Sequence, residues 1–247
     1  MKTHFFASLI FILSVIFIDV QAQDSFENSP NKSESTKSFY TLSGVELLFN
    51  YMPAEIENEA FQQGVRTTYF FNVFGNAHID FSRFIGLKTG ISVRNVGVKT
   101  NDEEIHDEKY RKVIRRAYMF GASGAIKIGN LQNFNFVYFG AACEIPFHYR
   151  QRNVQKNMKL IRSEWMPNVT ERFIPSVFIG YQSPKYINIQ ARYYLSNFIK
   201  PSYNGVYGDF SSFSNTQIFQ ISLSFQQRES DKNGTIRERI LQPLTEI

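Results

Sequence analysis

Residues 217–226 read QIFQISLSFQ, and from Phe219 to Gln226 apolar and polar side chains alternate without interruption. Phe219, Ile221, Leu223 and Phe225 share one face of an extended chain, while glutamine and serine share the other. Successive side chains of a β-strand point to opposite faces, so this alternation predicts a strand with one apolar and one polar face.

Seven further segments show the same alternation, and helical spacing is scarce between them. The eight predicted strands cover residues 40–51, 68–81, 85–99, 113–128, 134–150, 172–182, 186–198 and 217–226. Their lengths are near the roughly 9–11 residues with which a tilted strand crosses a bilayer, against about five or six in ordinary sheets. Their polar faces carry small, amide and charged side chains, which is typical of a barrel with a polar interior. A soluble sandwich also alternates, whereas a lipocalin-type barrel would place bulky apolar groups inside.

The lengths of the connections favour the membrane barrel over the sandwich. Three connections are short, namely residues 82–84, 129–133 and 183–185. Four are long, namely residues 52–67, 100–112, 151–171 and 200–216. Long and short alternate strictly, as expected when short turns face the periplasm and long loops face outward. We therefore predict an all-β fold, an eight-stranded antiparallel up-and-down transmembrane β-barrel.

Four segments are predicted along the chain. Residues 1–22 predict a cleaved signal peptide, because a basic start precedes an apolar run and small residues follow it. The apolar run has about 14 residues, short of the roughly 17–25 of a spanning helix. Residues 23–38 predict a disordered lead-in, residues 39–226 the outer-membrane barrel, and residues 227–247 a charged periplasmic tail.

Composition restricts the possible functions. The chain has 25 Phe and 13 Tyr among 247 residues, yet its mean hydropathy is slightly polar, so apolar and polar residues must be closely interleaved. Cys143 is the only cysteine, which excludes an intramolecular disulfide. The net charge of +5 is scattered and predicts no nucleic-acid partner. No cofactor is expected.

Two motifs and the aromatic-ended last strand resemble a known family. Residues 86–90 (GLKTG) and 193–198 (YYLSNF), within a match over residues 40–226, are similar to the small outer-membrane β-barrel (porin-like) proteins of Bacteroidota-type bacteria. The resemblance implies a Gram-negative outer membrane, contact with its lipid and lipopolysaccharide, and for a few relatives a role in protein secretion or nutrient uptake. The chain departs from that pattern by continuing past Phe225 and by having Gln220 where the barrel-assembly signal often has glycine.

Seven charged side chains are predicted to point inward, namely Glu46, Asp80, Lys88, Arg94, Lys127, Glu144 and Arg192. The interior of an eight-stranded barrel is just wide enough for side chains to fill. Because an unpaired buried ion is costly, we expect these residues to form a salt-bridged network that occludes the lumen. The alternative is a selective pore.

Candidate catalytic or metal-binding residues are few. His78 and His148 are predicted to face inward, with Glu144 near His148, and a lipid-deacylating triad would need a serine beside them. Such a site would have to face lipid, so no catalytic residue is assigned. A metal site of the two histidines with Asp80 lacks close ligand spacing.

Charged and aromatic residues are expected near the strand ends. Arg115 and Arg116, with the acidic segment 101–109, predict a solvated outer loop or a rim site for divalent cations or lipopolysaccharide phosphates. Aromatic girdle positions are predicted at Tyr51, Tyr118, Tyr149, Tyr193 and Phe198.

The expected function is non-enzymatic, a structural or interaction barrel that meets partners through its outer loops or periplasmic tail. A periplasmic or outer-membrane protein is one possible partner. The alternatives are a porin-like barrel that transports a small solute, and a lipid-modifying enzyme.

Overall fold

The computed structural model describes residues 38–53, 55–56, 59–60, 63–105, 108–156, 158–211 and 213–228. The predicted signal peptide lies outside these residues. So do the predicted lead-in, except for Ser38, and the predicted tail, except for residues 227 and 228. Among the described residues no helix has the length and apolar character to cross a membrane.

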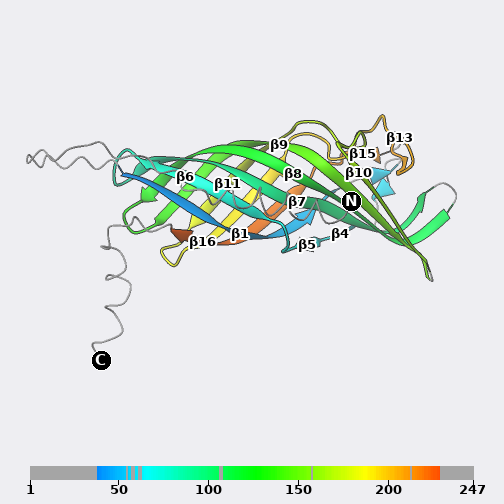
Figure 1. The fold of residues 1–247 in the computed structure, drawn as a ribbon, viewed down its shortest axis with the longest axis horizontal. Coiled ribbons are helices and arrows are strands. Elements are labelled where there is room, and N and C mark those ends of the chain that lie inside the picture. Colours follow the sequence, from blue (N-terminus) through cyan, green and yellow to red (C-terminus); the bar gives the residue numbers. More distant parts are fainter. Residues whose placement is uncertain are drawn as a thin grey trace, which may run out of the picture. The chain divides into compact units, whose positions relative to one another are not determined.

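Eight long strands form a closed antiparallel ring (Figure 1). In chain order they are β1 (Ser38–Tyr51), β6 (Val73–Asp80), β7 (Ile85–Ile105), β8 (Glu108–Asn130), β9 (Asn135–Val154), β11 (Ile174–Gln182), β12 (Ile187–Tyr194) and β16 (Phe219–Arg228). Each pairs with the next, and β16 returns to pair with β1 from Leu42↔Arg228 to Tyr51↔Phe219. Closure leaves no unpaired sheet edge in the ring. The predicted eight-stranded up-and-down barrel is confirmed.

The outer surface of the ring is apolar, because alternate residues of every strand point away from the interior. Val45, Phe139 and Phe225 are 57%, 48% and 61% exposed, although their strand neighbours Glu46, Tyr138 and Ser224 are buried. Exposed large apolar side chains are usually scattered on a soluble protein, and a continuous band of them marks a surface that meets an apolar environment. This band is the outward apolar belt of a transmembrane barrel.

Three tight turns lie at one end of the barrel, at residues 81–84, 131–134 and 183–186. Both ends of the described barrel chain lie at this turn end, because Ser38 pairs with Asp80 and Arg228 pairs with Leu42. The longer connections gather at the opposite, loop end. Their predicted strict alternation with the short turns holds.

Two of the segments predicted as loops contain long strand extensions. Residues 100–112 continue β7 and β8 as a ribbon that pairs as far as Ile105↔Glu108. Residues 151–171 continue β9 to Val154 and add β10 (Lys159–Trp165), which pairs with β9. Outside the apolar belt both faces of a strand can be polar, so the alternation that reveals a strand fades while the backbone ladder continues.

The second wall of the barrel contains a wide bulge, so its main strand begins at Val73 rather than at the predicted residue 68. Before it, β4 (Gln63–Gly64) pairs with β7 and β5 (Arg66–Thr68) pairs with β1. Val45↔Val73 and Leu48↔Thr68 are both paired, so three steps along β1 match five on the neighbouring segment, which has two extra residues and bulges outward. The aromatic side chains of this bulge are exposed and are Tyr69, Phe70 and Phe71.

Asn72 closes the gap that this bulge leaves in the ladder. Its side-chain amide donates to the carbonyl oxygens of Glu46 (3.2 Å) and Thr68 (3.0 Å), and its Oδ1 accepts from the backbone N–H of Asn95 (2.7 Å). One buried amide therefore replaces the backbone partners that three chain segments lack at this point.

Short elements cover the loop end. β2 (Glu55–Ile56), β3 (Glu59–Ala60) and β15 (Phe213–Ser214) form a small sheet, and β13 (Asn204–Gly205) pairs with β14 (Gly208–Asp209). Tyr207, Phe210 and Phe213 are buried. The loop end therefore has a packed core of its own.

Candidate functional site

The middle of the barrel interior holds an ion network from four strands. Arg94 of β7 donates from Nε to Glu46 Oε2 of β1 (2.8 Å) and from Nη1 to Glu144 Oε1 of β9 (2.7 Å). Arg192 of β12 donates to the same Glu144 oxygen (3.1 Å), and Tyr194 Oη donates to its other oxygen (2.9 Å). All five side chains are buried. We call Glu46, Arg94, Glu144 and Arg192 the central ion network.

The strands place these side chains together because each occupies an inward position at a similar height. The central ion network joins walls that are far apart in sequence, since the Arg94–Glu46 and Arg94–Glu144 bonds span 48 and 50 residues. Charge-assisted bonds of this kind are roughly twice as strong as neutral ones. Each of these bonds cross-links two strands that have one other strand between them in the ring.

A second ion pair lies nearer the turn end. Lys127 contacts Asp80 and lies 3.2 Å from both Tyr40 Oη and His78 Nδ1. Lys88 forms no ion pair with a described carboxylate, and its Nζ lies 4.1 Å from the centroid of the Tyr138 ring. An aromatic face attracts a cation at such a distance. The seven predicted lumen residues are thus all buried, six in ion pairs and Lys88 against an aromatic ring.

Large apolar side chains lie in the interior on both sides of the central ion network, which corrects the expectation of a polar lumen. The turn-end cluster consists of Tyr40, Leu42, Ala125, Leu131, Phe134, Phe136, Tyr138, Ala142 and Phe178. The loop-end cluster includes Leu48, Met52, Val96, Val98, Ala117, Met119, Tyr149, Ile174, Tyr194 and Phe198, with Tyr207, Phe210, Phe213 and Ile218 from the connections.

The order along single strands shows how these layers stack. On β1, Glu46 lies between Leu42 of the turn-end cluster and Leu48 of the loop-end cluster. On β9, Glu144 lies between Ala142 and Tyr149 in the same way. Along these two strands the central ion network therefore lies between two apolar clusters, and the turn-end side also holds the buried Lys127–Asp80 pair and Lys88.

A third buried ion-pair site lies within the loop end. Arg115 Nη1 donates to Glu103 Oε2 (2.7 Å), and its guanidinium lies 5.1 Å from the centroid of Phe210. Burial by itself would lower the pKa of Arg115, but the attraction of Glu103 outweighs burial and raises it. Nearby, burial raises the pKa of the Tyr207 phenol to about 12. The pair fixes the β7–β8 ribbon against the connection between β12 and β16.

A bulge in β9 corrects the predicted direction of two residues. The register shifts between Tyr118 and Met119, which face His148 and Pro146, so Phe147 is an extra residue. The extra residue reverses the alternation beyond it. His148, predicted to face inward, instead packs outside against Trp165 with ring centroids 4.8 Å apart. Tyr149, predicted for the girdle, is fully buried inside.

Other predicted positions divide between the two faces. Phe198 is buried in the loop-end cluster rather than placed on the girdle, whereas Tyr51 and Tyr193 are exposed. Arg115 and Arg116 do not form one patch, since Arg115 points inward and Arg116 outward. The sequence offered one cue to the aromatic layers: Phe178 interrupts the small and polar face of its strand.

The two histidines lie on opposite faces of the barrel wall. His78 stacks on Tyr40 with ring centroids 4.8 Å apart and lies inside, whereas His148 lies outside. Within the described ranges no group of three His, Cys, Asp or Glu side chains is placed to hold a metal ion.

No protein-family model matches the sequence, and no curated protein matches it. Among solved structures, Ail, the attachment invasion locus protein of Yersinia pestis, has a TM-score of 0.36 and 8% identity over 78% of this chain and 99% of its own. Ail in complex with the heparin analogue sucrose octasulfate gives a TM-score of 0.34 and 8% identity over 77% and 98%. Neisserial surface protein A gives 0.35 and 11% over 77% and 97%. At these values the likeness carries no conclusion about function, and the barrel is defined by its own strand pairing.

Proposed function

We propose that this chain is a non-enzymatic barrel of a Gram-negative outer membrane, which acts as a structural or interaction protein. In this proposal the apolar belt contacts outer-membrane lipid and lipopolysaccharide. The turn end faces the periplasm, and the loop end faces outward and meets partners. The predicted periplasmic tail, residues 227–247, is a second candidate contact for a protein partner.

The observation that carries this proposal is the layered interior. A conducting pore needs a continuous water-filled path, but here the central ion network lies between two apolar clusters. Opening a path would separate ion pairs in a low-dielectric interior and leave buried charges uncompensated. Interaction through the outside of the molecule requires no such opening.

The loop end supports the choice of interaction surface. Its connections are held by a packed core and the buried Arg115–Glu103 pair. Binding surfaces that are already ordered lose little entropy on association. The loop end is therefore suited to present a fixed shape.

Membrane insertion is tested by gel mobility of the refolded protein with and without boiling, and orientation by proteolysis of intact cells. We expect a mobility shift on boiling and cleavage confined to the loop-end connections. Release of the protein by osmotic shock, without a mobility shift, would contradict the proposal.

The competing transport function is tested by conductance in a planar bilayer. We expect no steady single-channel current from the wild type. A current that changes when Glu144 is replaced by Gln would favour the transport barrel instead.

A further inference from the structure

The outward face of β7, β8, β9 and β10 carries a group of cations just beyond the apolar belt. The strand registers align its side chains in rows across the sheet. The first row is Asn95, Tyr118, His148 and Trp165. The next three rows are Gly97, Arg116, Arg150 and Ser163; then Lys99, Ile114, Arg152 and Ile161; then Asn101, Lys112, Val154 and Lys159.

Six of these sixteen positions are cations and none is Asp or Glu. We call Lys99, Lys112, Arg116, Arg150, Arg152 and Lys159 the basic stripe. No described carboxylate forms an ion pair with any of the six. Arg116 and Arg150 are direct cross-strand partners, an arrangement in which like charges destabilise a sheet.

The cations of the stripe repel one another. The pKa of the Arg116 guanidinium is lowered, mainly by burial and in addition by repulsion from Arg150 and Arg152. The pKa of the Lys112 amine is likewise lowered, mainly by burial and in addition by repulsion from Lys99 and Arg152. Arg152 Nε is buried without a hydrogen-bond partner among the described residues. An anion bound on the stripe would relieve this repulsion.

The aromatic first row marks the depth of the stripe in the membrane. Trp165 packs against His148 and Phe147, and Arg116 lies 5.9 Å from the centroid of the Tyr118 ring. Aromatic side chains of this kind gather at the membrane–water interface. With the loop end outward, as proposed above, the stripe lies at the headgroup level of the outer leaflet.

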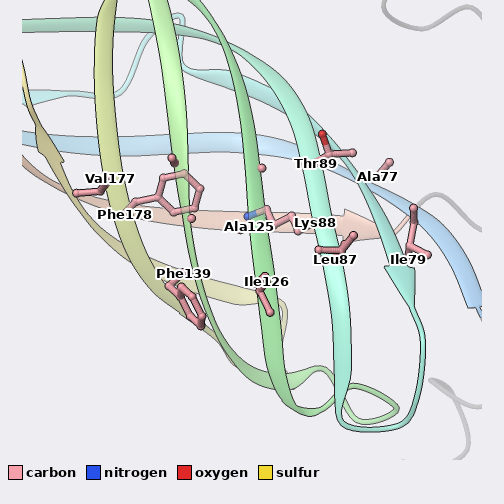
Figure 2. Close-up of a pocket in the computed structure, with 13 residues that line it drawn as sticks. Ala77, Ile79, Leu87, Lys88, Thr89, Ala125, Ile126, Phe139, Val177 and Phe178 are labelled. Carbon is pink, nitrogen blue, oxygen red and sulfur yellow. The ribbon is translucent and has the colours of Figure 1, made fainter.

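A furrow lined mainly by apolar side chains indents the belt on β6, β7, β8, β9 and β11, and three of these strands also carry the stripe (Figure 2). Its volume is about 660 Å³. Small residues form its base, with Ala77, Thr89, Gly124 and Ala141 in register. Larger side chains form its border on the side of the turn end, namely Ile79, Leu87, Ile126 and Phe139.

The furrow lies at the depth that an acyl chain reaches from the stripe. Arg116 and Gly124 are eight residues apart on β8, about 27 Å along the strand. A strand tilt of about 40° reduces this to a depth of about 20 Å. Half of a bilayer with its headgroups is also about 20 Å thick.

We propose that the basic stripe and the furrow together bind one phosphorylated glycolipid of the outer leaflet, with its phosphates on the arginines and an acyl chain in the furrow. Guanidinium groups bind phosphate through paired charge-assisted hydrogen bonds. The proposal rests on the outer-membrane placement given under "Proposed function" and adds a specific lipid site to it.

The test uses the mature protein in phosphatidylcholine nanodiscs with increasing amounts of bis-phosphorylated lipid A. Trp165 is the only tryptophan, is 56% exposed and lies one row from the stripe, so its fluorescence reports binding there. We expect a saturable change in Trp165 emission with lipid A, and a smaller one with lipid A that lacks its phosphates.

The charge variant is Arg116→Gln/Arg150→Gln, and we expect it to weaken lipid A binding by about tenfold or more. Its matched control is Arg83→Gln/Lys185→Gln, which removes the same charge from exposed turns at the other end. Equal binding by the two variants would overturn the proposal.

The furrow variant is Gly124→Leu, which fills the groove at a site where a Cβ atom meets no other atom within 4 Å. Gly75→Leu is its control, because a Cβ atom at Gly75 is equally unhindered and Gly75 does not line the furrow. We expect only Gly124→Leu to weaken binding of acylated lipid A, while both leave binding of the deacylated phosphosugar unchanged. Equal effects of the two would overturn the acyl part of the proposal.

Two further outcomes separate the possible failures. If heparin binds the protein as tightly as lipid A and loses binding in the same arginine variant, the stripe is a polyanion site and the lipid assignment is wrong. Boiling-dependent gel mobility is recorded for every variant. Loss of the mobility shift in the wild type would refute the membrane placement, whereas a folded wild type without lipid A selectivity would refute only this inference.

Discussion

Two of the buried ion-pair sites pair arginine with glutamate, but they hold together parts of the barrel of different size. The central ion network ties residues 48 and 50 positions apart, on strands in different parts of the ring. The Arg115–Glu103 pair ties residues 12 positions apart on one hairpin. The first holds the barrel as a whole, and the second holds only the loop end. We therefore expect the sequence separation of the paired residues, rather than the bond geometry, to decide how much of the barrel is destabilised when each site is removed.

The largest effect is expected from Glu144→Gln. This change removes the shared carboxylate of Arg94 and Arg192 and leaves Arg192 buried without its anion. We expect the free energy of unfolding of the whole barrel to fall by about 4–5 kcal/mol, measured by urea titration in lipid vesicles. Glu104→Gln, at an exposed carboxylate, serves as control. An unchanged urea midpoint would show that the network does not hold the walls.

A smaller and local effect is expected from Glu103→Gln. Arg115 then stays buried against Phe210 without its partner, at a cost of about 3 kcal/mol. We expect faster hydrogen exchange in the connection between β12 and β16, with the exchange of β11 and β12 unchanged. Faster exchange across all eight strands would erase the distinction between the two sites.

The apolar layer can be disturbed separately from both ion sites. A Cβ atom at Gly180 would overlap the ring of Tyr138, which donates to Asn188 Oδ1 at 2.7 Å. We expect Gly180→Ala to lower the free energy of unfolding by about 1–2 kcal/mol through overpacking. Gly75→Ala, with no atom near its Cβ, is expected to be neutral in the same titration.

The smallest expected quantity is the coupling free energy between the two carboxylate changes. The sites share no residue, so the effects of Glu144→Gln and Glu103→Gln on loop-end opening should add within about 0.5 kcal/mol. Hydrogen exchange of the double variant, compared with each single variant, measures this coupling. A larger coupling would mean that the apolar layer between the sites transmits strain.

Alternation was sufficient to predict the barrel within the membrane belt. The belt requires apolar residues outward, so positions such as Val45 and Phe225 reveal both the strand and its direction. The inward direction of residues such as Glu46 and Arg94 followed from the same pattern. Their pairing did not, because it depends on barrel closure and on the relative heights of strands that are not neighbours.

The remaining errors arise where alternation loses its meaning. His148 is polar and fits the inward position that alternation predicts, so the sequence gives no sign that Phe147 is the extra residue. Beyond the belt, the paired charges Glu104 and Lys109 appeared to belong to a loop although they face each other in a ribbon. The sequence analysis also missed the loop-end core, because its aromatic residues lie in connections where apolar and polar residues do not alternate.

The pairing of β1 with β16 also governs the timing of assembly. Gln220 donates to Asn50 across this seam at 2.7 Å, and the two residues are 170 positions apart. Contacts between residues so distant in sequence form slowly, because a long loop must close before they contribute. Until that seam forms, both terminal strands have open edges that can pair with other chains. Closure of this seam therefore removes the two strand edges through which the barrel could aggregate.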